Sequence, residues 1–266
     1  MRAGDRRVGS GRREGSEAAR SVVRVHGMRA ALAILERRPR DVLRAWVGPR
    51  PPATLEAGLE PLRRFGVVVH RVGRDDLARL CGSAHHEGIV VDVRPRTGRT
   101  AAELAADRST GLLVALIGAS NPHNVGAVMR VAAHFGIAAV LCDPEAARSG
   151  GATLRTAQGA AEHVECVAVS SWPAVLDSFA SAGFRVVATV VRAGRSLFEA
   201  ELPRRTLVLF GSEADGLPGW ALRRAHDAVT IPGTGAVESL NLATAVAIVA
   251  AEHVRRHGFH ARPHGR

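Results

Sequence analysis

The sequence predicts an α/β protein in which a small α/β unit precedes a larger unit built on a doubly wound parallel sheet. The 266 residues are 46% hydrophobic and 23% charged, so the chain can bury a sizeable core and is not disordered as a whole. Short apolar runs alternate with helix-like segments along most of its length, which is typical of α/β architecture. A break at residues 95–99 separates two such series of elements.

The first series occupies residues 23–96. Its expected elements are, in order, a helix from His26 to before Pro39, a strand at 42–47, a helix at 55–64, a strand at 67–70, a short helix capped by Asp75 or Asp76, and a strand at 89–93. Alternation of helices and strands over about 70 residues indicates a small α/β domain. Residues 97–110 are expected to link it to the second domain, at 111–257.

The second series begins with a nearly continuous apolar run at 112–117, as expected for a buried parallel strand. The expected elements that follow are a helix at 125–135, strands at 138–141 and 164–169, a helix at 172–182, strands at 185–191, 206–210 and 229–231, and a helix at 240–253. Gly136 can close the first of these helices in the left-handed conformation. The last helix is apolar on nearly all sides, which predicts that it is buried.

The basic residues of the chain are all arginines, and the net charge is +11. Lys and Tyr are absent while Ala, Gly and Val abound, so part of this basicity reflects compositional bias. Residues 1–22 carry six arginines against three acidic residues and lack hydrophobic periodicity, which predicts a disordered basic arm. Residues 258–266 form a second basic tail. Such ends either hold phosphates through counterion release or are simply solvated, and both interpretations stay open.

The sequence also indicates where the protein works. The longest apolar stretch, at 240–251, is shorter than the roughly 20 residues of a membrane span, and the first 20 residues lack the apolar core of a secretory signal. Three cysteines, an odd number spaced far apart, favour reduced thiols over a disulfide framework. We therefore expect a cytoplasmic protein with no membrane contact.

Three segments share one form, in which an apolar strand leads into a Gly-, Asn-, Ser- or Glu-containing loop and then a helix start. They are NPHNVGAVMR at 121–130, LVLFGSEADGL at 207–217, and IPGTGAVESLNL at 231–242. The loops that follow parallel strands meet at one edge of the sheet, so we expect the three to converge. Glycines there allow a backbone to approach a ligand closely, and helix starts offer unpaired N–H groups.

These segments resemble motifs 1, 2 and 3 of the SpoU (TrmH-type) methyltransferases of the SPOUT superfamily, in the family's order over residues 112–256. The preceding unit, from VHGM at 25–28 to GIV at 88–90, resembles the substrate-binding domain of such enzymes. The resemblance implies a 2′-O-ribose methyltransferase for rRNA or tRNA that uses S-adenosylmethionine. It also implies a deep C-terminal trefoil knot and a homodimer whose active site lies near the interface.

Arg130 and Asn124 are the catalytic candidates of motif 1. From its chemistry alone Arg130 is a phosphate clamp, because a guanidinium binds phosphate in a bidentate manner. The resemblance instead gives this arginine a role in activating the ribose 2′-hydroxyl. A group with a pKa above about 12 is a poor base, so whether Arg130 accepts the proton or positions the hydroxyl stays open. Asn124 either organises the loop or caps the helix.

Glu213, Ser239 and Asn241 complete the catalytic candidates. The resemblance places Glu213 in the catalytic centre, where it can orient an arginine or the substrate; the alternative is a carboxylate that faces a helix dipole. Ser239 and Asn241 match motif 3, which lines both the catalytic and the cofactor sites. Ser239 could equally be a helix N-cap.

The resemblance also assigns a cofactor site, held mainly by backbone groups in the knot. Its residues are Leu209, Gly211, Ile231, Gly235, Ser239 and Leu240. Methyl transfer from a sulfonium depends on in-line positioning, so no Cys or His nucleophile is needed.

Several alternatives remain at this point. A SPOUT enzyme could methylate a base nitrogen, or the chain could be a non-catalytic RNA-binding protein on the same scaffold. His123 is an alternative base, and residues 155–160 resemble a family loop that could face RNA. A metal site at Cys81, His85 and His86 is not expected, because no second ligand cluster accompanies them.

Overall fold

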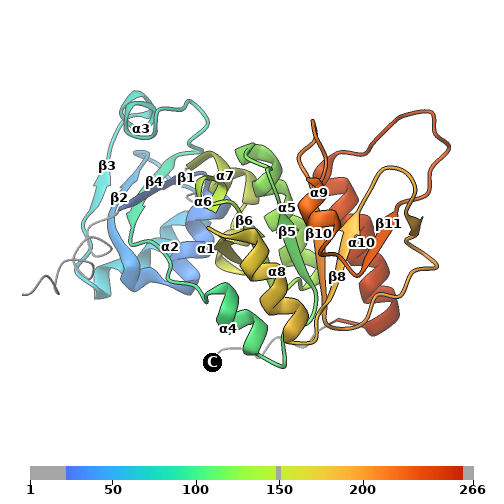
Figure 1. Cartoon of the computed structure of the whole chain (residues 1–266). Coiled ribbons are helices and arrows are strands. Elements are labelled where there is room, and N and C mark those ends of the chain that lie inside the picture. Colours follow the sequence, from blue (N-terminus) through green and yellow to red (C-terminus); the bar gives the residue numbers. More distant parts are fainter. Residues whose placement is uncertain (1–21, 148–150, 260–266) are drawn as a thin grey trace, which may run out of the picture.

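The computed structural model describes residues 22–147 and 151–259, which form a four-stranded and a seven-stranded sheet side by side (Figure 1). The predicted basic arm lies outside the described residues except for Val22. The same holds for the predicted basic tail except for Gly258 and Phe259.

The small unit has the order β1 (Val23–His26), α1 (Met28–Arg37), β2 (Val42–Val47), α2 (Ala53–Arg64), β3 (Val69–Arg71), α3 (Arg74–Cys81) and β4 (Ile89–Val93). The strands lie in the order β1-β4-β2-β3, where β4 is antiparallel to both neighbours and β3 is parallel to β2. The sequence predicted every element except β1. The predicted cap of α3 is wrong, because Gly73 occupies the N-cap position and Asp75 and Asp76 lie in the first turn.

One face of this sheet forms the core of the small unit. Buried side chains of α1 and α2, among them Leu35 and Leu62, pack on Val91 and its neighbours. The short helix α3 covers part of the opposite face, where Leu77 is buried. That second face is therefore only partly shielded from solvent.

The larger unit contains α4 (Ala101–Ala106), β5 (Leu113–Leu116), α5 (Pro122–Phe135), β6 (Ala139–Cys142), α6 (Pro144–Ala147), α7 (Gly151–Ala157), β7 (Glu165–Ala168), α8 (Trp172–Ser181), β8 (Arg185–Thr189), β9 (Arg195–Ser196), β10 (Thr206–Phe210), α9 (Gly219–Leu222), β11 (Asp227–Thr230) and α10 (Leu242–His257). Its strands lie in the order β7-β6-β5-β10-β8-β11-β9, and all six pairings are parallel. The predicted parallel sheet is confirmed.

Helices cover both faces of the large sheet (Figure 1). Buried residues of α5, α7 and α10 form a core with one face, and those of α4, α8 and α9 form a core with the other. Strands β5, β6 and β10 are buried at every residue, as expected for parallel strands covered on both faces.

The helices differ from the predictions in several places. Helices α6, α7 and α9 lie in segments for which no helix was predicted. Residues 97–110 contain α4, whose N-terminus is a capping box formed by Thr100 and Glu103. Residues 155–160 are not a loop but the end of α7 and the start of a 3-10 turn, Ala160–Glu162. Helix α10 is buried along one face only, because a stripe that includes Thr244, Ala251 and Arg255 is exposed.

The two units are held together by α7 and the 3-10 turn, which pack on β1 and α1 (Figure 1). Arg38, just after α1, donates to both carboxylate oxygens of Glu162 at 2.7 and 3.0 Å. The Glu162 side chain is only 5% exposed. A buried carboxylate needs a paired cation, so this contact links the small unit to the larger one.

Candidate active site

The large sheet reverses its strand order between β5 and β10. Strands β6 and β7 follow β5 in sequence and lie on one side of it in the sheet. Strands β8, β10 and β11 come later in the sequence and lie on the other side of β5. In such sheets a crevice forms at the carboxyl ends of the strands where the order reverses, and ligands bind there. The loops after β5 and β10 leave from this point.

The first loop turns sharply after β5. Gly118 has a φ of 75°, and its N–H donates to Asp143 Oδ2 at 2.8 Å. Asn121 then caps α5 by accepting from the N–H of His123 at 2.9 Å. The cap is Asn121, so the prediction that Asn124 could cap this helix is wrong.

The second loop is a tight turn after β10 that carries Glu213 at its tip. The Ser212 carbonyl accepts from the N–H of Gly216, and the Ser212 hydroxyl accepts from the N–H of Asp215, at 3.0 and 2.9 Å. A Cβ on Gly211 would lie 2.0 Å from the carbonyl carbon of Gly216, so no larger residue fits there without a shift. Glu213 therefore lies in a turn, and not at a helix start as one prediction had it.

The third loop runs from Ile231 to Leu240 without helix or strand, and all its residues after Ile231 are exposed. Asn241 caps α10 by accepting from the N–H groups of Ala243 and Thr244. The possible N-cap role of Ser239 is therefore excluded.

The structure brings all three loops together. A Cβ on Gly118 would lie 3.7 Å from the Cβ of Ser212, so the first and second loops are in contact. The second and third loops meet where Asn241 Nδ2 donates to Glu213 Oε1 at 3.3 Å. The predicted convergence of the loops is confirmed, and two catalytic candidates lie within hydrogen-bond distance of one another.

The motif 1 candidates lie on α5, the helix that follows the first loop. Arg130 is exposed on α5, eight residues after the first residue of the helix, Pro122, which is about 12 Å along the helix axis. Asn124 is half-buried in the first turn of α5. Within the described part of the chain, no hydrogen bond or ion pair joins Arg130 to Glu213. His123, the alternative base, places Nδ1 3.3 Å from the hydroxyl of Thr156.

The predicted cofactor residues fall into two groups. Leu209 is completely buried in β10, and its carbonyl accepts from the Thr189 hydroxyl at 2.8 Å. The others lie in the second and third loops, or at their starts: Gly211, Ile231, Gly235, Ser239 and Leu240. Leu240 is 43% exposed and Gly235 has a φ of 81°. Apolar side chains beside irregular backbone suit an adenine ring, which packs on one and hydrogen-bonds to the other.

Sequence reasoning missed Asp143, which follows β6. Its carboxylate accepts from Gly118 N–H and also from Trp172 Nε1, the latter at 2.6 Å, and so fixes the first loop to α8. A carboxylate directly after a buried parallel strand was the available signal.

The described ranges 22–147 and 151–259 contain no helix long and apolar enough to cross a membrane. In those ranges no three His, Cys, Asp or Glu side chains are grouped as metal ligands would be.

Comparison with known proteins identifies the family. Residues 111–251 match the SpoU rRNA methylase family, and residues 24–98 match the RNA 2′-O ribose methyltransferase substrate-binding family. The uncharacterized tRNA/rRNA methyltransferase YfiF of Escherichia coli O157:H7 is 34% identical over 235 residues, which cover 88% of this chain and 68% of YfiF. The 23S rRNA (guanosine-2′-O-)-methyltransferase RlmB of Vibrio vulnificus is 30% identical over 237 residues, covering 87% of this chain and 96% of RlmB.

Among solved structures, the SpoU methyltransferase AviRb from Streptomyces viridochromogenes, in complex with AdoMet, superposes with a TM-score of 0.75. It is 23% identical and the match covers 92% of this chain and 94% of AviRb, so it establishes the fold alone. The family and sequence matches confirm the expectation of a 2′-O-ribose RNA methyltransferase. The chain belongs to the SpoU rRNA methylase family.

Proposed function

We propose that the two units divide the family's reaction between them. The small unit, residues 24–98, holds rRNA or tRNA, and the larger unit transfers a methyl group to a ribose 2′-hydroxyl of that RNA. The observation that carries this proposal is the meeting of three loops at the reversal point of the large sheet. The domain boundaries follow from the same division, with α4 in the segment that joins the units.

The cofactor, S-adenosylmethionine, supplies an electrophilic methyl group on a sulfonium. Gly211, Ile231, Gly235, Ser239 and Leu240 hold it, together with the main chain at Leu209. Two features of the chain support this assignment: the loop after Ile231 leaves its backbone outside any helix or strand, and Leu240 offers an exposed apolar surface beside it. The net acidic second loop, with Glu213 and Asp215, suits a cationic ligand.

In the proposed mechanism Arg130 activates the ribose 2′-hydroxyl. Its guanidinium donates to the ribose or to the adjacent phosphate and so aligns the oxygen for attack. Glu213, held by the Asn241 amide, orients this arginine or the ribose. Ser239 and Asn124 hydrogen-bond at the rim of the site. Arg130→Gln retains hydrogen-bond donors without the charge, and its rate against pH distinguishes proton acceptance from positioning.

We further propose that two copies of the chain complete each active site. No hydrogen bond or ion pair joins Arg130 to Glu213 among the described residues of one copy, and both side chains are exposed. Exposed apolar side chains lie beside the site, including Val237 at 71% and Leu240 at 43%. A homodimer that covers them brings Arg130 of one protomer to Glu213 of the other.

Mixing two inactive variants tests this arrangement. Arg130→Ala and Glu213→Gln each lose activity alone, but half of the dimers formed after mixing hold one intact site. We expect about a quarter of the wild-type rate to return. No recovery from a mixture shown by mass to contain heterodimers would overturn the shared site.

We also propose that the C-terminal part forms the deep trefoil knot of the family. The order of the strands supports this proposal. Strand β8 lies between β10 and β11, yet Asn241, after the loop that follows β11, donates to Glu213 in the loop that follows β10. A cytoplasmic location is consistent with an RNA substrate and with the absence of a spanning helix in the described residues.

The experiment that tests the function compares ribose methylation maps of total RNA from cells with and without the gene. One or a few 2′-O-methyl positions should disappear when the gene is absent. Titration calorimetry with S-adenosylmethionine separates an enzyme from a binding protein, because a non-catalytic RNA-binding protein shows no heat of binding at millimolar ligand. Loss of a base methylation instead would favour the base-methylating alternative.

A further inference from the structure

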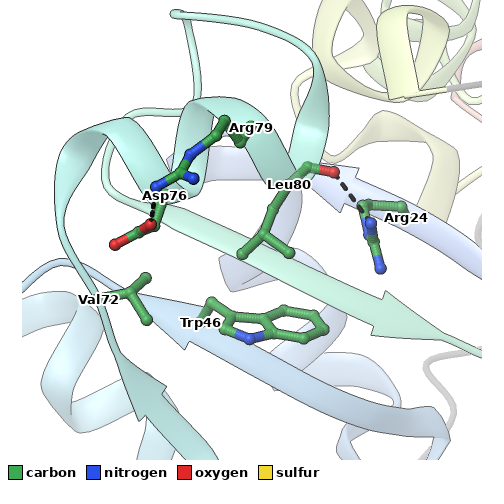
Figure 2. A pocket seen from close by; sticks show the side chains of 6 residues that line it. All are labelled: Arg24, Trp46, Val72, Asp76, Arg79 and Leu80. Carbon is green, nitrogen blue, oxygen red and sulfur yellow. Dashed lines mark hydrogen bonds and ion pairs between the residues drawn. The ribbon is translucent and has the colours of Figure 1, made fainter.

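The face of the small sheet that α3 covers only in part carries Trp46, which is half-buried. Along β2 the side chains alternate, so that Ala45 and Val47 enter the core while Arg44 and Trp46 lie on the opposite face. Helix α3 covers part of that face. Figure 2 shows Trp46 on β2, with Leu80 of α3 on one side of the indole and Arg24 of β1 beside them.

Strand register places an ion triad next to Trp46. Asp92 of β4 lies opposite Arg24 of β1 and opposite Arg44 of β2. The Asp92 carboxylate is 1% exposed, accepts a hydrogen bond from Arg24 Nε at 2.7 Å and forms an ion pair with an Arg44 terminal nitrogen at 2.9 Å. Arg24 also donates to the Leu80 carbonyl at 2.9 Å. One buried carboxylate therefore fixes two arginines in place.

Both arginines lie over the indole. The Cζ atoms of Arg24 and Arg44 are each 5.4 Å from the centroid of the Trp46 ring, within the range of cation–π interaction. His70 of β3 is paired with Trp46 across the sheet, and their rings stack at 5.9 Å with an interplanar angle of 22°. The result is a preorganised surface of two π-systems and two cations.

This surface borders a depression of about 430 Å³. Its lining consists of Arg24, Trp46, Val72, Asp76, Arg79 and Leu80. Asp76 and Arg79 pair with each other at the rim (Figure 2), which leaves the apolar and aromatic groups as its floor. The hollow thus combines a flat apolar floor with fixed positive charge.

That combination matches an unpaired nucleotide. Bases in single-stranded RNA stack on aromatic side chains and on arginine planes, and the guanidinium groups also take up the phosphates. The small unit has the charge for such a ligand, because residues 24–98 hold 14 arginines against eight acidic residues, a net charge of +6. A base-paired helix buries its base faces and does not fit.

We propose that Trp46, with Arg24 and Arg44, binds an unpaired base of the substrate RNA. This inference rests on the proposed function for the identity of the substrate. It adds the part of the small unit that binds this RNA. The site selects RNA with a loop, bulge or single-stranded end near the ribose to be methylated.

The test measures binding without cofactor, so it does not depend on methyl transfer. The probes are an oligouridylate of about eight nucleotides and an oligomer of the same phosphate number with abasic riboses. The wild-type chain should bind the oligouridylate about tenfold more tightly than the abasic probe. Trp46→Leu should remove this preference, whereas Trp46→Phe should keep most of it.

Two further variants make the test specific. Phe65→Leu is a matched control, because Phe65 is an exposed aromatic of the same unit that also lies beneath an arginine, Arg40 at 5.2 Å, but outside the depression. It should leave both affinities unchanged. Arg44→Gln should lower the affinity for both probes by the same factor. It should also reduce the salt dependence of that affinity by the amount expected for about one phosphate contact.

Equal affinity of the wild-type chain for the two probes would overturn the proposal. So would an undiminished preference in Trp46→Leu with a wild-type thermal midpoint. If Trp46→Leu does not fold, the fallback is to compare how strongly oligouridylate quenches tryptophan fluorescence in the wild-type chain and in Trp46→Phe. Loss of the quenching in Trp46→Phe supports the site, and unchanged quenching refutes it. Methyl transfer measured on the same samples reports separately on the proposed function.

Discussion

The two units differ in how they carry charge. The small unit has a net charge of +6, whereas residues 111–251 carry ten arginines against 11 acidic residues, a net charge of −1. The three loops that meet all belong to the nearly neutral unit. This difference supports the proposed division, in which phosphate contacts to RNA belong to the small unit and the chemistry of a cationic methyl donor to the larger one.

The largest expected effect is on the rate of methyl transfer, without a comparable effect on RNA or cofactor affinity. Arg130→Ala should lower methyl transfer by about 10³-fold, because a charge-assisted contact to the reacting hydroxyl or its phosphate is lost. RNA affinity and S-adenosylmethionine affinity should change by less than about threefold, since the basic unit and the loops are intact. Single-turnover rates with separate binding titrations check both expectations. A weakened RNA affinity with a normal rate would reverse the division between the units.

The junction of the two units gives the next largest effect. Arg38→Met leaves the Glu162 carboxylate buried without its cation, and unfolding free energy should fall by about 3 kcal/mol. Arg38→Met combined with Glu162→Leu removes both partners and should recover most of this loss. Urea unfolding of the three proteins measures it. If the single variant is as stable as wild type, Arg38 does not hold the units together.

A smaller effect separates two roles of Asn241. Asn241→Ala removes the cap of α10 and the donor to Glu213, so stability should fall by about 1 kcal/mol and the methylation rate by about tenfold. Asn241→Ser keeps a capping oxygen but not the amide, and should lower only the rate. Thermal unfolding and rate measurements on both variants check this. Equal rates in Asn241→Ser and wild type would remove the Glu213 contact from the mechanism.

The smallest effect concerns the end of α10. The hydrogen bond from Arg255, with a further contribution from Arg256, lowers the pKa of Glu252 from 4.5 to about 2. A folded-state pKa below the unfolded value stabilises the fold above about pH 4.5, and this contribution is lost as the pH falls towards 2. Because Arg255 is 68% exposed, solvent screening limits the effect to a few degrees in the thermal midpoint.

Glu252→Gln tests this pH dependence. The midpoint of the variant should be lower than wild type at pH 7, and the difference should shrink by pH 3. A difference that is the same at both values would show that the ionised carboxylate is not what stabilises α10.

The sequence predicted the elements whose signal is local. Strands β4 and β10 match the predicted bounds of 89–93 and 206–210, since four of the five residues in each are apolar. Strand β1 was missed because two of its four residues are Arg24 and His26, and Arg24 is held there by Asp92, 68 positions away. Helix α4 was missed although Thr100 and Glu103 carry its capping signal.

The sequence was enough to predict where in the fold the candidate site lies, but not which of its side chains contact one another. The repeated strand–loop–helix form predicted that the loops meet, and they do. That Asn241, not Ser239, caps α10 and also reaches Glu213 depends on the tight turn after Gly211, which no local pattern of residue types determines. The predicted roles of Arg130 and Asn124 stay predictions, as does the knot.

One measurement tests the central claim most directly. RNA incubated with the protein and S-adenosylmethionine carrying a labelled methyl group is digested to nucleosides, and the labelled product is identified by mass spectrometry. We predict a 2′-O-methylated nucleoside from the wild-type chain and none from Arg130→Ala. Label on a base, or no label from a folded wild-type protein that binds the cofactor, would contradict the account.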